Sequence, residues 1–271
     1  MRVFVLIKQV PGTANVKMDE KTGTMIRTEN ENVINPLDEN ALEAAISLRK
    51  KVAGTKVVAL SMGPRPAAGA LREALAMGAD EAVLLSDRSF AGSDTMATAA
   101  ALAAGVKHLA GGALHSDDLV LCGERATDGE TGQVGPMVAA LLGIPVSTYV
   151  KGIEVRQEEV EVERIVEEGF EKVSLSLPAV LTVVKDLNQP GFPTLAGKLA
   201  AKNAEIPVLG PDELGVSRDV LGLGGSPTRV VKVFRPKFAR ETQMHQHDNS
   251  GKAIDALVEF LNQRGLEQVG E

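Results

Sequence analysis

Apolar and polar positions follow one another in the first half of the chain in the manner of an α/β protein. Short runs that are apolar throughout predict strands buried on both faces of a sheet. These runs lie at residues 2–7, 56–62, 81–85 and 119–122. Between them, apolar residues at helical spacing predict helices over residues 36–51, 65–77 and 95–109. This order of elements predicts a doubly wound, mostly parallel sheet with right-handed crossovers.

Two of these helices have recognisable start signals. Asn35 precedes Pro36, with acidic residues in the first turn, and Ser93-Asp94 precedes the long Ala-rich helix. Asn and Asp are preferred capping residues, and Pro suits the first helical position. We therefore expect Asn35 and Asp94 to cap the helices that follow them.

The pattern changes after Pro145. Residues 147–156, 159–166 and 173–177 alternate between apolar and polar, which indicates an antiparallel hairpin at one sheet edge. The apolar run 180–184 should return to the main sheet. The fold class is thus α/β, with flavodoxin-like layering of the adenine-nucleotide-binding kind, an antiparallel edge hairpin and an extended C-terminal arm.

From residue 187 the sequence no longer resembles a compact domain. We predict an α/β nucleotide-binding domain at 1–186, then a docking loop and a C-terminal arm at 187–271 that wraps a partner subunit. The loop exposes Phe192 and Leu195, and short helices are expected at 194–201 and 252–264. An irregular arm as long as 203–249 is uncommon within a domain, so it is better explained as a segment laid on a partner.

Composition narrows the function. The formal net charge of −7 argues against nucleic acid as the main partner, because binding a phosphate backbone needs a concentrated basic surface. Cys122 is the single cysteine, which excludes an intramolecular disulfide. Aromatic residues are 3%, with one Tyr and no Trp, so the core must be aliphatic. We find no secretory signal and no apolar run that would span a bilayer, and we expect a cytoplasmic protein or one in the soluble interior of an organelle.

The richest chemistry lies between Leu119 and Gly143. A short strand is followed by a polar, Gly-rich loop at 123–133 and then by a helix with an apolar stripe. Glycine lets a phosphate approach the backbone, and the start of a helix offers unpaired N–H groups. The alternative is a tight turn at Asp128-Gly129, but the loop holds more polar groups than a turn needs.

Three loops should meet at the carboxyl edge of the sheet: 8–11, 62–64 and 123–134, with 35–38 beside them. Together they would suit an adenine nucleotide or dinucleotide, with Asp38 or Asp128 near a hydroxyl and the 131–134 amides near phosphate. The GxGxxG and GxxxxGK[ST] motifs are absent. His108, His115, His245 and His247 suggest no metal site, and we identify no catalytic side chain, so the chemistry should belong to a cofactor.

Several segments are similar, in order, to the beta subunit of electron transfer flavoprotein. They include LIKQVP near the N-terminus, NPLDENALEAA at 35–45, CGERATDGETGQVGPMVAALLGIP at 122–145 and PAVLTVVKDLNQPGFPTLAGKLAAK at 178–202. The resemblance covers the chain from its first strand to about residue 235. It implies a heterodimer with an alpha subunit that holds FAD. It also implies electron exchange with an acyl-CoA dehydrogenase of fatty acid oxidation, a quinone reductase or ferredoxin, without membrane insertion.

The resemblance also implies a second nucleotide in this chain. By motif, its contacts fall on the following residues: Leu6, Asn35, Pro36, Leu37, Asp38, Met62, Gly123, Glu124, Arg125, Ala126, Thr127, Asp128, Gly129, Glu130, Thr131, Gly132, Gln133 and Val134. In the family, the loop that carries Phe192 and Leu195 docks onto the partner dehydrogenase.

Members of the family differ in that second nucleotide. Plain electron carriers hold AMP, whereas electron-bifurcating members hold a second FAD that takes a hydride from NADH. Residues 128–136 read DGETGQVGP and resemble the bifurcating pattern DGDTAQVGP. Small residues at Gly129 and Gly132 would leave room for a pyrophosphate. We therefore expect FAD rather than AMP.

Two other classes remain open as alternatives. An ATP-dependent enzyme of the related α/β fold would need a Ser-Gly-Gly-x-Asp-Ser loop after the first strand, where this chain has Lys8 to Gly12. A nucleotide-sensing module would need no obligate partner, which the long arm from residue 186 argues against.

Overall fold

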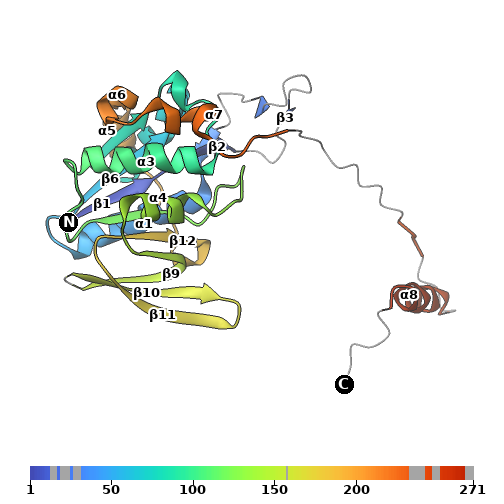
Figure 1. Cartoon of the computed structure of the whole chain (residues 1–271). Coiled ribbons are helices and arrows are strands. Elements are labelled where there is room, and N and C mark those ends of the chain that lie inside the picture. The colour runs from blue at the N-terminus through green and yellow to red at the C-terminus, as the bar shows by residue number, and fades with distance from the viewer. Residues whose placement is uncertain are drawn as a thin grey trace. The chain divides into compact units, whose positions relative to one another are not determined.

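The computed structural model describes residues 1–12, 17–18, 25–26, 32–156, 158–231, 242–245 and 251–265. Contacts divide the chain into two units, Met1–Val231 and Lys232–Glu271. The first unit holds the sheet (Figure 1). The second contains helix α8 (Lys252–Asn262), where the sequence predicts one. The sequence-based division at residue 186 stays a prediction.

The main sheet of the first unit has the strand order β11-β10-β9-β12-β8-β1-β6-β7-β13 in the described part of the chain. Its strands are β1 (Arg2–Leu6), β6 (Lys56–Met62), β7 (Glu81–Leu85), β8 (Leu119–Gly123), β9 (Val146–Arg156), β10 (Glu159–Val166), β11 (Gly169–Ser176), β12 (Ala179–Val183) and β13 (Val208–Leu209). Pairing is parallel except where β10 meets β9 and β11. The mostly parallel sheet with an antiparallel edge, as expected from the sequence, is confirmed.

Helices cover both faces of this sheet. Helices α1 (Pro36–Lys51) and α2 (Ala68–Met77) pack on one face, against residues such as Val3 and Val5 of β1. Helices α3 (Thr95–Leu109) and α4 (Val134–Leu142) pack on the other, against Phe4. Alternate residues of a strand point to opposite faces, so a strand that feeds two apolar layers must be apolar throughout. Figure 1 shows α3 crossing its face of the sheet.

The chain reverses its direction of winding at β1. From β1 it moves through α1 to β6 and through α2 to β7, and then crosses back through α3 to β8 on the other side of β1. The carboxyl ends of β8, β1, β6 and β7 therefore lie next to one another around a topological switch point. In open α/β sheets this crevice is where ligands bind.

Smaller elements fill the connections. Strands β2 (Gln9–Pro11) and β5 (Asn32–Ile34) pair, as do β3 (Lys17–Met18) and β4 (Met25–Ile26), in two antiparallel ribbons. The remaining helices are α5 (Leu195–Lys202), α6 (Pro211–Leu214) and α7 (Gly222–Gly225), with 3-10 turns at Arg65–Ala67, Arg88–Phe90, Lys185–Leu187 and Arg218–Val220.

Part of the segment assigned to the arm lies against the sheet. Strand β13 pairs with β7 at the sheet edge, and Leu221 is buried in the same apolar cluster as α3. The sequence does not predict this strand, because two residues are too few to show a pattern. The expected role of the arm in wrapping a partner stays a prediction.

The antiparallel edge contains one unusual backbone position. Tyr149 has a φ of 56° and lies in β9 where the pairing with β12 changes register, and the pairing with β10 changes register two residues later. Its side chain is 47% exposed. Positive φ is uncommon for a residue with a side chain, and here it accompanies a bulge that bends the strand.

Gly135 fixes the distance between α4 and the sheet. A Cβ at this position would lie 2.3 Å from Thr182 Cγ2 and 3.0 Å from Cys122 Sγ. Gly224 has a similar helical backbone, but a Cβ there would meet no described atom within 4 Å. The two glycines therefore form a matched pair.

We expect Gly135→Ala to destabilise the chain by about 1–3 kcal/mol, the usual cost of overpacking a core. Gly224→Ala should be neutral or slightly stabilising. Thermal unfolding of the two variants and the parent chain tests this. Equal melting temperatures for all three would show that α4 can move away from the sheet without cost.

Candidate functional site

The carboxyl ends of the central strands open into a cavity of about 1020 Å³. Its walls are the loops after β1, β6, β7 and β8, together with the starts of α3 and α4. This volume lies at the upper end of the roughly 300–1,000 Å³ that small-molecule sites occupy. The cavity lies at the switch point of the sheet, where a ligand is expected.

The structure brings most of the sequence-predicted site residues into this cavity. Those that line it are Leu6, Asn35, Asp38, Met62, Gly123, Glu124, Arg125, Ala126, Gly129, Glu130, Thr131, Gly132, Gln133 and Val134. Pro36, Leu37, Thr127 and Asp128 do not line it. Pro36 and Leu37 belong to the first turn of α1, and Leu37 is buried. The assignment of all these residues as nucleotide contacts stays a prediction.

One wall of the cavity, which we call the third wall, was not predicted from the sequence. Residues 86–88 and 90–95 follow β7 and line the cavity, and Thr98 and Leu102 of α3 extend this wall. The available signal was the position of this loop, because it too leaves the carboxyl end of a parallel strand. Its composition contains no glycine-rich motif that would have drawn attention to it.

Asp38 is the central polar group beneath the cavity. Its Oδ2 accepts a hydrogen bond from the backbone N–H of Lys8 at 2.8 Å, and its Oδ1 accepts one from Gly123 N–H at 2.9 Å. The carboxylate therefore joins the ends of β1 and β8 to the start of α1. A Cβ at Gly123 would lie 2.7 Å from Asp38 Oδ1, so only glycine permits this approach.

Burial raises the pKa of Asp38 to about 6, although the two backbone hydrogen bonds and the side chain of Asn35 act in the opposite direction. Burial also raises the pKa of the neighbouring Cys122 thiol. Cys122 is therefore an un-ionised structural thiol at neutral pH, as its apolar sequence context indicates.

Asn35 does not cap α1 as expected. It occupies the capping position, but its side chain makes no capping hydrogen bond. Instead Nδ2 donates to Arg125 O at 2.9 Å, and Oδ1 accepts from Thr127 N at 3.1 Å. The amide side chain is almost fully buried and holds the loop after β8 in place. Tertiary hydrogen bonds have replaced the local one here.

The loop after β8 has a second attachment. Lys8 Nζ pairs with Asp128 Oδ1 at 2.5 Å, which explains why Asp128 holds the loop rather than lining the cavity. Within the loop, Glu130 and Gly132 have φ values of 46° and 65°. A left-handed backbone at two positions turns the chain sharply into α4.

The two helices that start at the cavity differ in their first turns. Asp94 caps α3, as expected, by accepting from Met96 N and Ala97 N. No described side chain caps α4, which begins after Gln133. The first N–H groups of a helix have no partner within the helix and carry a partial positive charge. The start of α4 is therefore the better of the two places for an anion.

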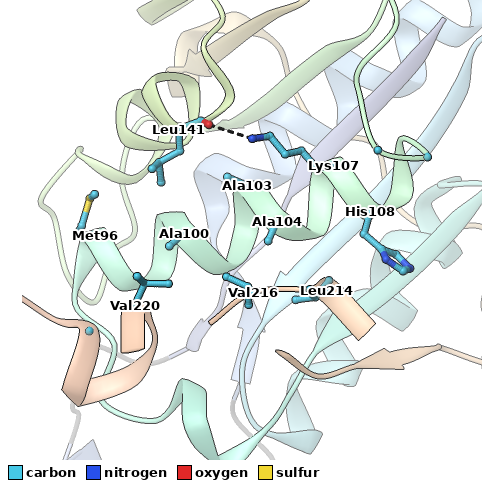
Figure 2. Close-up of a pocket in the computed structure, with 14 residues that line it drawn as sticks. Met96, Ala100, Ala103, Ala104, Lys107, His108, Leu141, Leu214, Val216 and Val220 are labelled. Carbon is cyan, nitrogen blue, oxygen red and sulfur yellow. Dashed lines mark hydrogen bonds between the residues drawn. The ribbon is translucent and has the colours of Figure 1, made fainter. Parts of the chain in front are cut away.

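A second cavity, of about 730 Å³, lies on the outer side of α3. Figure 2 shows Ala100, Ala103 and Ala104 of this helix facing it, with Val216 and Val220 from the later segment opposite. Lys107 Nζ donates to Leu141 O at 3.3 Å. The lining is dominated by small and apolar residues and offers little polar chemistry.

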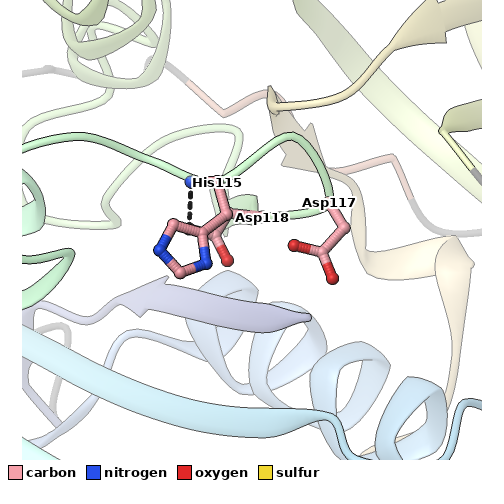
Figure 3. Close-up of side chains that lie close together, drawn as sticks. All are labelled: His115, Asp117 and Asp118. Carbon is pink, nitrogen blue, oxygen red and sulfur yellow. Dashed lines mark hydrogen bonds between the residues drawn. The ribbon is translucent and has the colours of Figure 1, made fainter.

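One cluster of possible metal ligands occurs among the described residues, at His115, Asp117 and Asp118 (Figure 3). Both carboxylates already have cationic partners. Asp118 pairs with Arg2 at 2.6 Å, and Asp117 pairs with the Met1 amine at 2.7 Å. We assign this cluster to ion pairing. His247 lies outside the described residues.

Phe192 and Leu195, the predicted docking residues, are 96% and 76% exposed. Thr194 caps α5 by accepting from Gly197 N, which places both apolar side chains around a helix start. Their role in docking stays a prediction. No helix in the described part of the chain is long and apolar enough to cross a membrane.

Comparison with known proteins identifies the family. Residues 22–214 match the electron transfer flavoprotein domain. The chain is 47% identical over 265 residues to the electron transfer flavoprotein subunit beta of Thermoanaerobacterium thermosaccharolyticum, with 97% of this chain and 99% of the relative covered. The chain belongs to the electron transfer flavoprotein beta-subunit family.

Two further relatives cover almost the whole chain. One is the electron transfer flavoprotein subunit beta of Megasphaera elsdenii, at 45% identity with 96% of this chain and 98% of the relative covered. The other is subunit CarD of the caffeyl-CoA reductase-Etf complex of Acetobacterium woodii, at 43% identity with 98% and 100% covered. The resemblance drawn from the sequence is confirmed, and the general function is electron transfer.

The raised pKa of Asp38 gives stability a defined pH dependence. A carboxyl whose pKa is higher in the folded than in the unfolded chain binds more protons when folded. The free energy of unfolding contributed by Asp38 should therefore fall as pH rises from about 4 to about 6, by about 3 kcal/mol, and stay constant above.

Asp38→Asn removes this titration while keeping the size of the side chain. The difference in unfolding free energy between the parent chain and the variant should change in this pH window in favour of the variant. Urea unfolding at a series of pH values measures it. Parallel curves for the two proteins would contradict the assignment.

Proposed function

We propose that this chain binds a nucleotide cofactor in the 1020 Å³ cavity and passes electrons as the beta subunit of a heterodimer with an alpha subunit. The observation that carries the proposal is the convergence of four strand ends and the uncapped start of α4 on one cavity. Family membership supports electron transfer as its purpose. It also makes an ATP-dependent enzyme or a nucleotide-sensing module the less favoured alternatives.

The site fits a flavin dinucleotide. Gly129 and Gly132 line the cavity. A Cβ at Gly129 would meet its nearest described atom at 3.9 Å, and a Cβ at Gly132 would meet its nearest at 3.5 Å. The space beside the loop is therefore open where a pyrophosphate would need it. The size of the cavity also favours a dinucleotide over AMP. The alternative, structural AMP in a non-bifurcating carrier, would leave part of this space to water.

The residues of this chain have binding roles in the proposal. The N–H groups at 131–135 would hold phosphate oxygens, helped by the partial positive charge of α4. Asp38 and Asn35 would fix the walls rather than touch the reacting atoms. A bound flavin would supply the redox chemistry, with NADH as electron donor if the complex bifurcates electrons.

We further propose partners for electron exchange. Phe192 and Leu195 form an exposed apolar pair that suits docking onto an acyl-CoA dehydrogenase or a related reductase. Ferredoxin or a quinone reductase would take electrons from the complex. The names of two relatives, a subunit of the caffeyl-CoA reductase-Etf complex and an acryloyl-CoA reductase electron transfer subunit, support a reductase of this kind. The cytoplasmic location stays a prediction.

The nucleotide content of the purified complex with its alpha subunit tests the cofactor. We expect two FAD per heterodimer after denaturing extraction and chromatography. One FAD and one AMP would replace the bifurcating assignment by that of a simple carrier. A complex without flavin would overturn the proposed function.

Lys8 offers a more local test, because its ion pair with Asp128 holds the loop after β8. Lys8→Ala should lower the nucleotide occupancy of the beta subunit and speed nucleotide loss on dilution. Lys56→Ala is the matched control, since Lys56 pairs with Glu81 at 2.6 Å and the two lysines are similarly exposed, at 48% and 46%. Equal nucleotide occupancy in both variants would show that the Lys8 pair does not support binding.

A further inference from the structure

Residues 221–228 lie against the third wall of the cavity, more than 125 residues away from it in sequence. The backbone N–H of Leu223 donates to Ala91 O at 3.0 Å, and Gly222 N–H donates to Ser93 Oγ at 3.1 Å. We refer to residues 221–228 as the strap. Its contacts fall on residues that line the cavity, while the strap residues themselves do not line it.

Asp94 is the junction between the strap and the wall. Its Oδ1 caps α3 by accepting from Met96 N and Ala97 N, at 3.0 and 3.1 Å. Its Oδ2 accepts from the strap, at 2.9 Å from Thr228 N and 2.8 Å from Thr228 Oγ1. The backbone N–H of Asp94 donates to Ser226 Oγ at 2.8 Å. One carboxylate thus binds the start of α3 and the strap at the same time.

The strap approaches the wall so closely that a side chain would not fit. A Cβ at Gly222 would lie 2.1 Å from Ser89 O and 3.0 Å from Ala91 O. Further along α3, the second cavity lies between the helix and residues 214–220, which precede the strap, and small side chains of α3 face it (Figure 2). Hydrogen bonds at the start of α3, together with buried Leu221, are therefore the main attachments of the strap.

The strap is also the connection to the rest of the chain. Three residues after Thr228 the first unit ends, and the chain continues into the second unit.

We infer that the strap is a positioning element for the nucleotide cavity, and that its contacts with the wall at 86–95 couple the affinity of the cavity to the binding of the strap. With the strap bound, the wall at 86–95 and the first turn of α3 are held against the ligand. With the strap drawn away, Asp94 loses three hydrogen bonds and the wall loosens. The inference rests on the proposed function only in naming a nucleotide as the ligand.

Two glycines with left-handed backbones allow a controlled test. Gly222 has a φ of 57° and Gly215 a φ of 64°, but a Cβ at Gly215 would meet no described atom within 4 Å. Gly222→Ala and Gly215→Ala share the same backbone strain, and only the first displaces the strap. A second, milder pair of variants replaces a serine with alanine. Ser226→Ala is the test, because it removes the acceptor for the Asp94 N–H. Ser217→Ala is its control, because the Ser217 hydroxyl donates to Asp219 and does not contact Asp94. This pair serves if Gly222→Ala does not fold.

The measurements are hydrogen–deuterium exchange and nucleotide release from the complex with the alpha subunit. In Gly222→Ala, exchange at the amides of Asp94, Met96 and Ala97 should rise roughly 5- to 30-fold, the factor produced by one or two kcal/mol. Release of the co-purified nucleotide into excess free FAD should quicken in the same variant. Gly215→Ala should match the parent complex in both.

The outcomes separate the inference from the proposed function. Faster exchange without faster release would leave the strap as a structural contact and overturn the coupling. Unchanged exchange in both Gly222→Ala and Ser226→Ala would overturn the strap itself. If no nucleotide co-purifies, the proposed function fails, and the exchange measurement still decides whether the strap holds the wall.

Discussion

The carboxylate of Asp38 is the group on which the geometry of the site depends. It accepts the backbone N–H groups at the ends of β1 and β8, the two strands that flank the switch point, and it belongs to the helix that leaves this edge. Without it, two buried N–H groups would lose their acceptor, at a cost of about 1–3 kcal/mol each. The same burial that makes these bonds strong makes the charge costly, which is why its pKa is raised. Asp38 therefore both joins the strands at the centre of the fold and shapes the cavity.

Around Asp38 the cavity is built mainly by loops, and hydrogen bonds and an ion pair with the rest of the protein hold these loops in place. Asn35 holds the loop after β8 through two hydrogen bonds, Lys8 holds it through an ion pair, and Asp94 joins the wall after β7 to the strap. These groups use their polar atoms on the protein itself. The start of α4, which no described side chain caps, stays open to a negatively charged ligand. Such a site can bind a nucleotide through backbone groups, so its affinity depends on how firmly the loops are held.

The sequence predicts the layered fold because its signals are local. Apolar runs such as residues 3–6 mark strands that are buried on both faces. Asp94 is predicted correctly as a cap because the two N–H groups that it caps are only two and three residues away. Asn35 shows where this reasoning stops. Its neighbours predict a cap, yet its side chain bonds to residues 90 and 92 positions away. The strap was missed for the same reason, since contacts across more than 125 residues leave no periodic trace. The wall after β7 was missed because its loop contains no glycine-rich motif. Strand β13 is too short to be recognised without its partner.

The position of Tyr149 has a practical consequence. It is the single tyrosine of a chain without tryptophan, and it lies half exposed at the irregularity of β9. Nearly all intrinsic near-ultraviolet fluorescence of this subunit therefore comes from one point on the antiparallel edge of the sheet. The fluorescence of Tyr149 would therefore report a partner that packs against this edge, or a straightening of the bulge. No added label is needed, and no other tyrosine or tryptophan of the chain contributes to the signal.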